Sequence, residues 1–369
     1  MAESGLAVPI RATLWGKAIE AGQFRLLDAA RNWRRTVYQS LDSTGSDPSW
    51  AALSPRRRTA QDASGPDPLL IAEPMLVKRN VVGVLLVEEG DEPRRLRPRR
   101  LEIIHGMGQQ IAMAIQADLL QREMVAREHL ETEVELARQI QKAFIPHVLP
   151  HRDGWELAAR WETARQVGGD FYDVVELGGG RLGLFIADVA DKGMPAALFM
   201  ALTRTLFRAA VAQEAAPAQA LRRINDLLFP DTRQGMFVTA VYGVLDPANG
   251  SFTYANAGHN PPIWLHRKGT AQELERTGLA LGVINQSEVQ ERRLLLERGD
   301  SLLLYTDGVT EAFAPDGSLF GEERLLAAVG SQPRGSAEIL VHRVETRLRA
   351  FMRTLPLADD LTMLAVSRL

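Results

Sequence analysis

The sequence contains no cysteine. This absence excludes disulfide bonds, zinc sites with thiolate ligands and every hydrolase that uses a cysteine nucleophile. Aromatic residues make up only 6% of the 369 residues, and the formal net charge is -3. A chain so close to neutrality has no overall field that would draw it to nucleic acid, so we expect no nucleic-acid partner.

Long apolar runs are also missing. No stretch reaches the roughly 18 uninterrupted apolar residues that a membrane span needs, and the N-terminus shows no basic-then-apolar signal pattern. The phosphate-loop, HExxH and GxSxG motifs do not occur, which argues against an ATPase, a zinc protease and an α/β-hydrolase. Together with the lack of cysteine, these absences predict a cytoplasmic protein without a membrane partner. The length is enough for two domains of ordinary size.

Acidic residues stand at the ends of apolar runs in four places. Asp170 follows two glycines, Asp188 and Asp307 each close a strand-like run, and the pair Asp359-Asp360 opens another. Carboxylates that gather in one cleft repel one another unless cations neutralise them. Oxygen ligands select hard ions such as Mg²⁺ or Mn²⁺. The pattern therefore predicts one shared metal centre, at which two ions could activate water for hydrolysis of a phosphoester.

Five segments carry this pattern, in the order VGGDFYD, ADVADKGMPAALFM, NAGHNPP, LLLYTDGVTEA and DDLTMLAV. From about Glu133 onward they resemble the SpoIIE-like (RsbU-type) bacterial branch of the PPM metal-dependent serine/threonine phosphatases. The resemblance implies an α+β fold, an αββα sandwich of two antiparallel sheets flanked by helices, with two Mn²⁺ or Mg²⁺ ions at one end. The implied catalytic ligands are Asp170, Asp188, Asp307 and Asp359 with the backbone carbonyl of Val189, and Asp360 is an uncertain further metal ligand.

Each of these residues also has a plainer interpretation. Asp307-Gly308 alone is an ordinary turn dipeptide, and an Asp-Asp pair could simply begin a strand. Asp173 is expected to lie outside the ligand set. His259 could be an acid for the leaving group, but between Gly258 and Asn260 a hydrogen bond that stabilises a turn is the favoured interpretation.

One departure from the family pattern concerns the turn after Val189. Where the family often has Ser-Gly, this chain has Ala190-Asp191, so Asp191 could add charge near the ions, although we expect it to be solvated. Arg165 could contact phosphate, but only its closeness to Asp170 in the sequence suggests this.

The N-terminal third is harder to interpret. Leu14 to Trp33 has helical spacing, and two β-rich runs from Pro68, joined near Lys78-Arg79-Asn80, precede a helix that begins near Leu101. This succession resembles the last part of a GAF sensor domain, which implies a possible small ligand. The predicted domains are a partial GAF-like α/β domain at 1–120, a helical linker at 121–147 and the phosphatase domain at 148–369.

The linker has apolar residues at spacings of four and three. The candidate seam of a short coiled coil consists of Leu130, Val134, Ala137, Gln141 and Phe144. A helix packed on its own domain explains the same spacing. The resemblance to sensor, linker and phosphatase chains favours a homodimer through the linker, which would pass a signal to the phosphatase.

Within the phosphatase domain we predict strands near Trp155–Trp161, Phe171–Leu177 and Leu182–Val189, a hairpin around residues 247–250, and a last strand after Asp360. The helix that starts at Met194 should bury one face, consisting of Leu198, Leu202, Leu206 and Ala210. Strands and helices that occur in blocks favour an α+β sandwich over a parallel sheet.

The leading functional hypothesis is a metal-dependent protein serine/threonine phosphatase under control of the N-terminal domain. By resemblance, its substrate would be a phosphorylated STAS-type anti-sigma-factor antagonist, in a stress or partner-switching pathway. A non-catalytic phosphatase-like binding module is the alternative, although such a protein should have lost ligand carboxylates. A two-metal phosphodiesterase is a third hypothesis, and the seven histidines, which do not cluster with the acidic motifs, argue against it.

Overall fold

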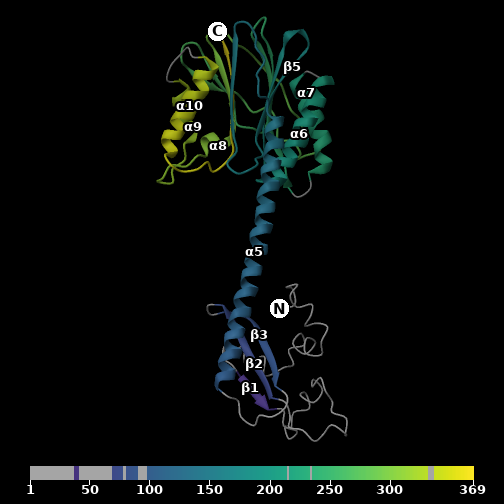
Figure 1. The fold of residues 1–369 in the computed structure, drawn as a ribbon. Helices are drawn as coiled ribbons and strands as arrows, with labels where there is room; N and C mark the ends of the chain where they lie inside the picture. Colours follow the sequence, from purple (N-terminus) through teal and green to yellow (C-terminus); the bar gives the residue numbers. More distant parts are fainter. Residues whose placement is uncertain are drawn as a thin grey trace. The chain divides into compact units, whose positions relative to one another are not determined.

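The computed structural model describes residues 37–40, 69–77, 80–89, 98–213, 216–232, 235–330 and 336–369. The chain divides into two compact units, Met1–Leu130 and Glu131–Leu369. The division falls within one long helix, α5 (Pro98–Phe144), which is labelled in Figure 1. The boundary therefore lies inside the segment predicted as a linker. Proline suits the first position of α5, because the N–H group at that position has no partner within a helix.

The N-terminal unit contains an antiparallel sheet in the order β1 (Val37–Ser40), β2 (Leu69–Val77) and β3 (Asn80–Glu89). The two predicted β-rich runs are thus confirmed as paired strands. The carboxylate of Glu73 on β2 is buried and bonds to Nδ1 of His105 at 2.8 Å. The helix predicted at Leu14 to Trp33 lies outside the described residues, and the GAF-like identity stays a prediction.

Two five-stranded antiparallel sheets form the centre of the C-terminal unit. The β13 sheet has the order β10 (Ala271–Glu273), β9 (Ile263–Leu265), β12 (Ser301–Tyr305), β13 (Leu361–Arg368) and β4 (Trp155–Glu162). The β6 sheet has the order β11 (Arg292–Leu295), β8 (Ser251–Ala257), β7 (Val238–Asp246), β6 (Leu182–Val189) and β5 (Phe171–Glu176). The predicted strands and the hairpin between β7 and β8 are confirmed.

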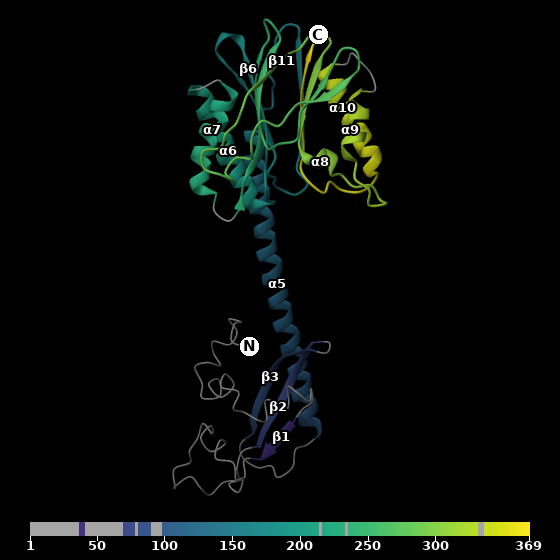
Figure 2. The same ribbon diagram turned by 180° about the vertical axis from the view of Figure 1, so that it is seen from behind.

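Helices cover the outer faces of both sheets. Figures 1 and 2 show α6 (Met194–Gln213) and α7 (Pro217–Leu228) on one side of the paired sheets, and α9 (Gly321–Gly330) and α10 (Ala337–Met352) on the other. A short helix, α8 (Asp307–Thr310), follows β12. The unit is therefore the predicted αββα sandwich.

Side-chain alternation along the strands builds the layers. On β12, Leu302 and Leu304 belong to the core between the sheets, whereas Leu303 and Tyr305 belong to the core beneath α9 and α10. Successive residues of a strand point to opposite faces, so a strand that is apolar at every position lies between two buried layers. The unbroken apolar runs that the sequence shows are explained by this four-layer arrangement.

The predicted buried face of α6 is confirmed at Ala210 and Leu206, which pack in or against the core, and wrong at its other two residues. Leu198 is 67% exposed and Leu202 is 36% exposed, whereas Phe199, Met200 and Phe207 lie in the core. Apolar residues occur around most of this helix, so its periodicity alone did not single out the face that packs on the β6 sheet. The same composition makes Met194–Ala212 long and apolar enough to cross a membrane, but one such helix is weak evidence, and its core contacts are those of a packed helix.

Candidate metal centre

Antiparallel pairing brings the predicted aspartates to one end of the sandwich. Asp170 precedes the first residue of β5, and Asp188 lies one residue before the end of β6; Phe171 pairs with Ala187, so these ends are adjacent. In the other sheet Tyr305, the last residue of β12, pairs with Met363 near the start of β13. Asp307 and Asp359 therefore also lie beside one another. The two pairs meet through contacts that cross between the sheets.

Asp170 links the two pairs of aspartates across the sheets. Its Oδ2 atom accepts hydrogen bonds from Oγ1 of Thr306 at 2.5 Å and Oγ1 of Thr362 at 3.0 Å, both from the β13 sheet. Its backbone carbonyl accepts a bond from Nε1 of Trp161 at 2.9 Å. With 2% of its surface exposed, Asp170 is held in a fixed orientation by residues of the opposite sheet.

Asp360 holds the loop that carries Asp170. Its carboxylate accepts the backbone N–H groups of Ala164 and Gly169, each at 2.8 Å. A side chain at Gly168 would overlap this carboxylate, which explains the glycine at that position. Both oxygens of Asp360 are thus engaged with backbone amides, an arrangement that favours Asp359 over Asp360 as a metal ligand.

Asp307 is brought to the same place by Gly308. The Cα atom of Gly308 lies so close to the backbone carbonyl of Asp360 that no Cβ could be accommodated. The Asp307-Gly308 dipeptide is therefore more than a turn, because its glycine allows α8 to approach the start of β13.

The aspartates raise one another's pKa. Burial raises the pKa of Asp170 well above its usual range, and the charges of Asp188 and Asp360 raise it further. Burial also raises the pKa of Asp188, although its hydrogen bond with Asp170 opposes this. For Asp307, burial followed by the charges of Asp188 and Asp359 raises the pKa to about 7. Carboxylates crowded in this way are stabilised by protons or by cations.

This donor set fits hard divalent ions. Four carboxylates that repel one another supply only oxygen ligands, and the carbonyl of Val189 lies against Gly169, next to Asp170.

Among the described residues, no three acidic or imidazole side chains converge closely enough to hold an ion as they stand. Protein donors satisfy the carboxylates instead: threonine hydroxyls bond to Asp170, and the Nζ atom of Lys192 lies 2.5 Å from Oδ2 of Asp359.

The structure places three other candidates outside the ligand set. Asp173 is fully buried and pairs with Arg208 and Arg204, so it is an ion-paired core residue rather than a solvated one. The carboxylate of Asp191 is exposed and accepts the N–H of Lys192 at 2.7 Å, which is a local turn bond. Arg165 lies near Lys192: the bond to Asp359 raises the pKa of that lysine, and the charge of Arg165 opposes the rise.

His259 occupies a structural position. Its backbone N–H donates to Oδ1 of Asn256 at 2.8 Å, and its carbonyl accepts bonds from Asn256 and Arg276 at 3.1 Å each. Nδ1 lies 2.7 Å from Oγ1 of Thr239. Burial lowers the pKa of the imidazole to about 3, which keeps it neutral. These contacts support the favoured turn-stabilising interpretation.

Sequence reasoning missed the neutral and basic side chains of this centre. Thr306 and Thr362 stand directly before Asp307 and two residues after Asp360, so their closeness to the acidic motifs was the available signal. Lys192 follows Asp191 within the second motif and could have been noted in the same way. Gln141 was predicted in a coiled-coil seam, yet its Nε2 donates to the carbonyl of Gly168 at 2.6 Å and its Oε1 accepts the N–H of the same residue at 3.1 Å.

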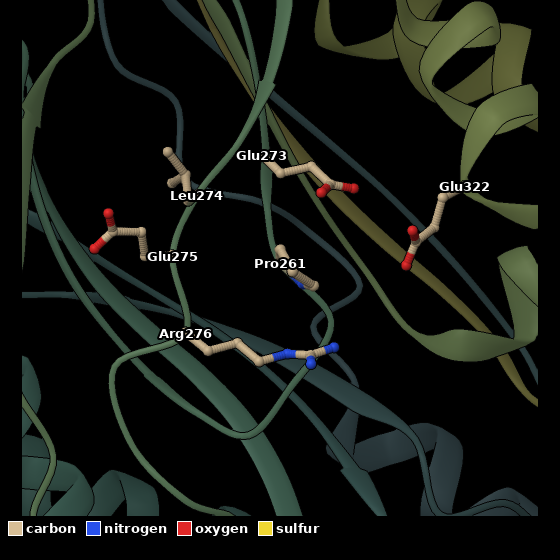
Figure 3. A pocket seen from close by; sticks show the side chains of 6 residues that line it. All are labelled: Pro261, Glu273, Leu274, Glu275, Arg276 and Glu322. Atoms are coloured by element: carbon tan, nitrogen blue, oxygen red, sulfur yellow. The ribbon is translucent and has the colours of Figure 1, made fainter.

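A separate hollow of about 590 Å³ lies at the edge of the β13 sheet. Its lining residues are Pro261, Glu273, Leu274, Glu275, Arg276 and Glu322. Figure 3 shows the carboxylates of Glu273 and Glu322 pointing toward one another, while Glu275 points away. None of the predicted metal ligands lines this hollow.

Comparison with known proteins agrees with this geometry. The family model described as Stage II sporulation protein E (SpoIIE) matches residues 178–369, more than half of the chain. The chain belongs to the SpoIIE family. Its C-terminal unit is accordingly a PP2C-type phosphatase domain, as the sequence predicted.

Two curated relatives extend the SpoIIE likeness toward the N-terminus. Protein IcfG of Synechocystis is 35% identical over 264 residues, which cover 64% of this chain and 41% of IcfG. Phosphoserine phosphatase RsbU of Bacillus subtilis is 28% identical over 243 residues, which cover 66% of this chain and 72% of RsbU. The chain thus spans less than half the length of IcfG.

A solved structure shows the same fold. The SiaA-PP2C domain of Pseudomonas aeruginosa superposes with a TM-score of 0.58 at 22% identity, covering 66% of this chain and 98% of that domain. At this identity the likeness concerns the fold alone.

Proposed function

We propose that this SpoIIE-family protein is a metal-dependent protein serine/threonine phosphatase. The observation that carries the proposal is the meeting of Asp170, Asp188, Asp307 and Asp359 at one end of a PP2C-type sandwich. These residues, with the carbonyl of Val189, would hold two Mn²⁺ or Mg²⁺ ions. When bound, such ions lower the pKa of water and neutralise phosphate charge, which suits hydrolysis of a phosphate monoester.

The surrounding side chains orient this centre. Thr306 and Thr362 fix Asp170 by hydrogen bonds from the opposite sheet, so one carboxylate oxygen of Asp170 keeps a constant direction. Asp360 fixes the loop before Asp170 through two backbone amides. Preorganisation of this kind matters because displacement of a ligand by a fraction of an ångström weakens a metal site.

The test is hydrolysis of an aryl phosphate and of a phosphoserine peptide as Mn²⁺ is added, with Asp188→Asn alongside. The wild type should release phosphate only with the metal, and Asp188→Asn should lose about a hundredfold or more of that rate, as is typical when catalytic charge stabilisation is removed. Asp226→Asn, an exposed position on α7, is the matched control and should retain full activity. Metal-independent hydrolysis, or full activity of Asp188→Asn, would contradict the proposal.

The proposed substrate is phosphoserine or phosphothreonine on a regulatory protein, a STAS-type anti-sigma-factor antagonist. Support comes from the likeness to RsbU, whose name describes a phosphoserine phosphatase. The substrate assay therefore includes a phosphorylated STAS-domain protein. A rate that is no higher with this protein than with the phosphoserine peptide would contradict this part of the proposal.

Control by the N-terminal unit is a further part of the proposal, and we expect the protein to act in the cytoplasm. Helix α5 runs without a break from residues of the first unit into the second, where Gln141 bonds to Gly168, two residues before Asp170. A change in the N-terminal unit, for example binding of a small ligand to a GAF-like domain, could reach the loop of Asp170 along this helix.

Dimerisation through α5 is also proposed, with a changed contact face. Gln141 of the predicted seam is buried in its own catalytic unit, so it cannot face a second helix. Leu136 and Ile140 lie four residues apart on one face of α5, are more than half exposed and offer an apolar surface for a second copy of the chain.

The alternative is a phosphatase-like binding module without catalysis. It would bind the phosphoprotein but release no phosphate under any metal condition. The ligand aspartates that the family pattern requires are all present, and this favours the enzyme.

A further inference from the structure

Lys192 makes a close contact with one predicted metal ligand. Its Nζ atom lies 2.5 Å from Oδ2 of Asp359. Burial raises the pKa of Asp188 and of Asp307, and the charge of Lys192 opposes this rise at both, so the ammonium group lies within electrostatic reach of three of the four carboxylates. Lys192 is therefore the internal cation of the acidic cluster.

The backbone around Lys192 leaves its side chain free to move away. The N–H of Lys192 bonds to the carboxylate of Asp191 at 2.7 Å, and Gly193 has a φ of 80°, so the main chain here is a fixed turn. The side chain itself is 48% exposed, and its described polar contact is the one with Asp359. A lysine side chain carries its ammonium group on a flexible stem of four carbons, so the ammonium group can change position without movement of the main chain.

We propose that Lys192 competes with a divalent ion for Asp359, and that the same ammonium group binds the substrate phosphate once the ion has displaced it. The inference rests on the proposed function. An ammonium group beside a carboxylate removes much of the attraction that the carboxylate offers to an incoming cation. Arg165 also lies close enough to Lys192 for their positive charges to act on one another. Two positive charges at the entrance of the site suit a phosphate dianion.

Removal of the ammonium should strengthen the binding of Mn²⁺ and weaken the binding of the phosphate substrate. Lys192→Met should bind Mn²⁺ about fivefold more tightly in a calorimetric titration, because the competing charge is gone. The KM for an aryl phosphate at saturating Mn²⁺ should rise several-fold, because the phosphate loses a counter-charge. If Lys192 only supported the local structure, its replacement would weaken the binding of both Mn²⁺ and substrate, or change neither.

Two further variants complete the design. Lys268→Met removes the same charge from an exposed turn between β9 and β10 and should leave both measurements unchanged. Lys192→Arg keeps the charge and should remain within about twofold of the wild type in Mn²⁺ affinity. Both methionine variants should show a single cooperative thermal unfolding transition in the absence of metal, which checks that they are folded, and Lys192→Met should unfold at the lower temperature because its carboxylates lose a counter-charge.

The outcomes separate the two proposals. Mn²⁺ affinity of Lys192→Met that equals or falls below that of the wild type would overturn the inference. An unchanged KM would overturn the part that concerns phosphate. A wild-type protein that binds no Mn²⁺ would contradict the proposed function itself, and the inference with it.

Discussion

Asp170 owes its orientation to residues that lie far from it in the sequence. Thr306 and Thr362 bind its carboxylate from the opposite sheet, and Asp360 holds the loop that precedes it. A carboxylate bound in this way cannot rotate freely. Folding has therefore already ordered the Asp170 side chain before a metal ion binds. The acidic cluster is therefore formed by the junction of two sheets.

His259 should make the folding stability of the protein depend on pH. Its pKa is about 3 in the folded protein because of burial, against about 6.5 in an unfolded chain. A base with a lowered folded-state pKa stays neutral in the native state while the unfolded chain takes up a proton. Stability should therefore fall as the pH drops from about 6.5 toward 3, by up to about 1.4 kcal/mol per pH unit.

The comparison is between the wild type and His259→Gln in urea unfolding from pH 7 to pH 4. Glutamine does not titrate, so the variant should lose less stability over this range, even though it is less stable at pH 7. The aspartates are common to both proteins, and the difference between the curves isolates the imidazole. Parallel curves would show that His259 becomes protonated in the folded state.

The sequence identified the acidic residues of the centre but not the division of their roles. Each aspartate stands at the end of an apolar run, and the ends of paired strands lie together, so their convergence was predictable. Asp359 and Asp360 are neighbours with the same chemistry, and only the backbone amides of Ala164 and Gly169 distinguish them. Such contacts depend on tertiary structure and leave no local pattern.

At the scale of elements, the side chain of Gln141 anchors helix α5 to the loop that precedes Asp170. The two hydrogen bonds between Gln141 and Gly168 are buried. Gln141→Ala should reduce the stability of the catalytic unit by about 1–2 kcal/mol, since it leaves both backbone groups of Gly168 without these partners. It should also lower kcat several-fold at saturating Mn²⁺, because the loop of Asp170 loses its anchor.

Gln139→Ala is the matched control for this prediction, because Gln139 is exposed on the same helix two residues away. Urea unfolding and aryl phosphate hydrolysis are the measurements. If the two variants behave alike in both, α5 does not act through this contact.

Helices proved harder to interpret from the sequence than strands. The apolar spacing of α6 assigned Leu198 and Leu202 to the buried face although both are exposed, and that of α5 placed a polar glutamine in an interhelical seam. Both helices have apolar residues on more than one face, so periodicity cannot tell which side a neighbour covers. Strands buried on both faces are apolar throughout, and their length and flanking glycines were enough to place them.

At the scale of the whole molecule, every predicted ligand belongs to one unit. Deletion of residues 1–130 leaves Glu131–Leu369, which contains both sheets and their flanking helices. This fragment should retain Mn²⁺-dependent hydrolysis of an aryl phosphate within about tenfold of the full chain, because a compact unit with its own core can fold alone. Regulation by the N-terminal unit should be lost.

Circular dichroism and thermal unfolding should first show that the fragment is folded. A folded fragment without any activity would mean that residues before Glu131 take part in the active site itself. Activity equal to that of the full chain under all conditions would mean that the N-terminal unit exerts no control.

The position of β13 has a consequence for protein synthesis. This last strand lies between β12 and β4, and it pairs along its whole length with β4, the first strand of the catalytic unit. On the ribosome, β4 emerges early and waits without this neighbour until Leu361–Arg368 has been translated and released. A nascent chain that has not yet released Leu361–Arg368 therefore lacks both the strand that joins β4 to β12 and the adjoining Asp359, so the acidic cluster can assemble only after this strand has left the ribosome.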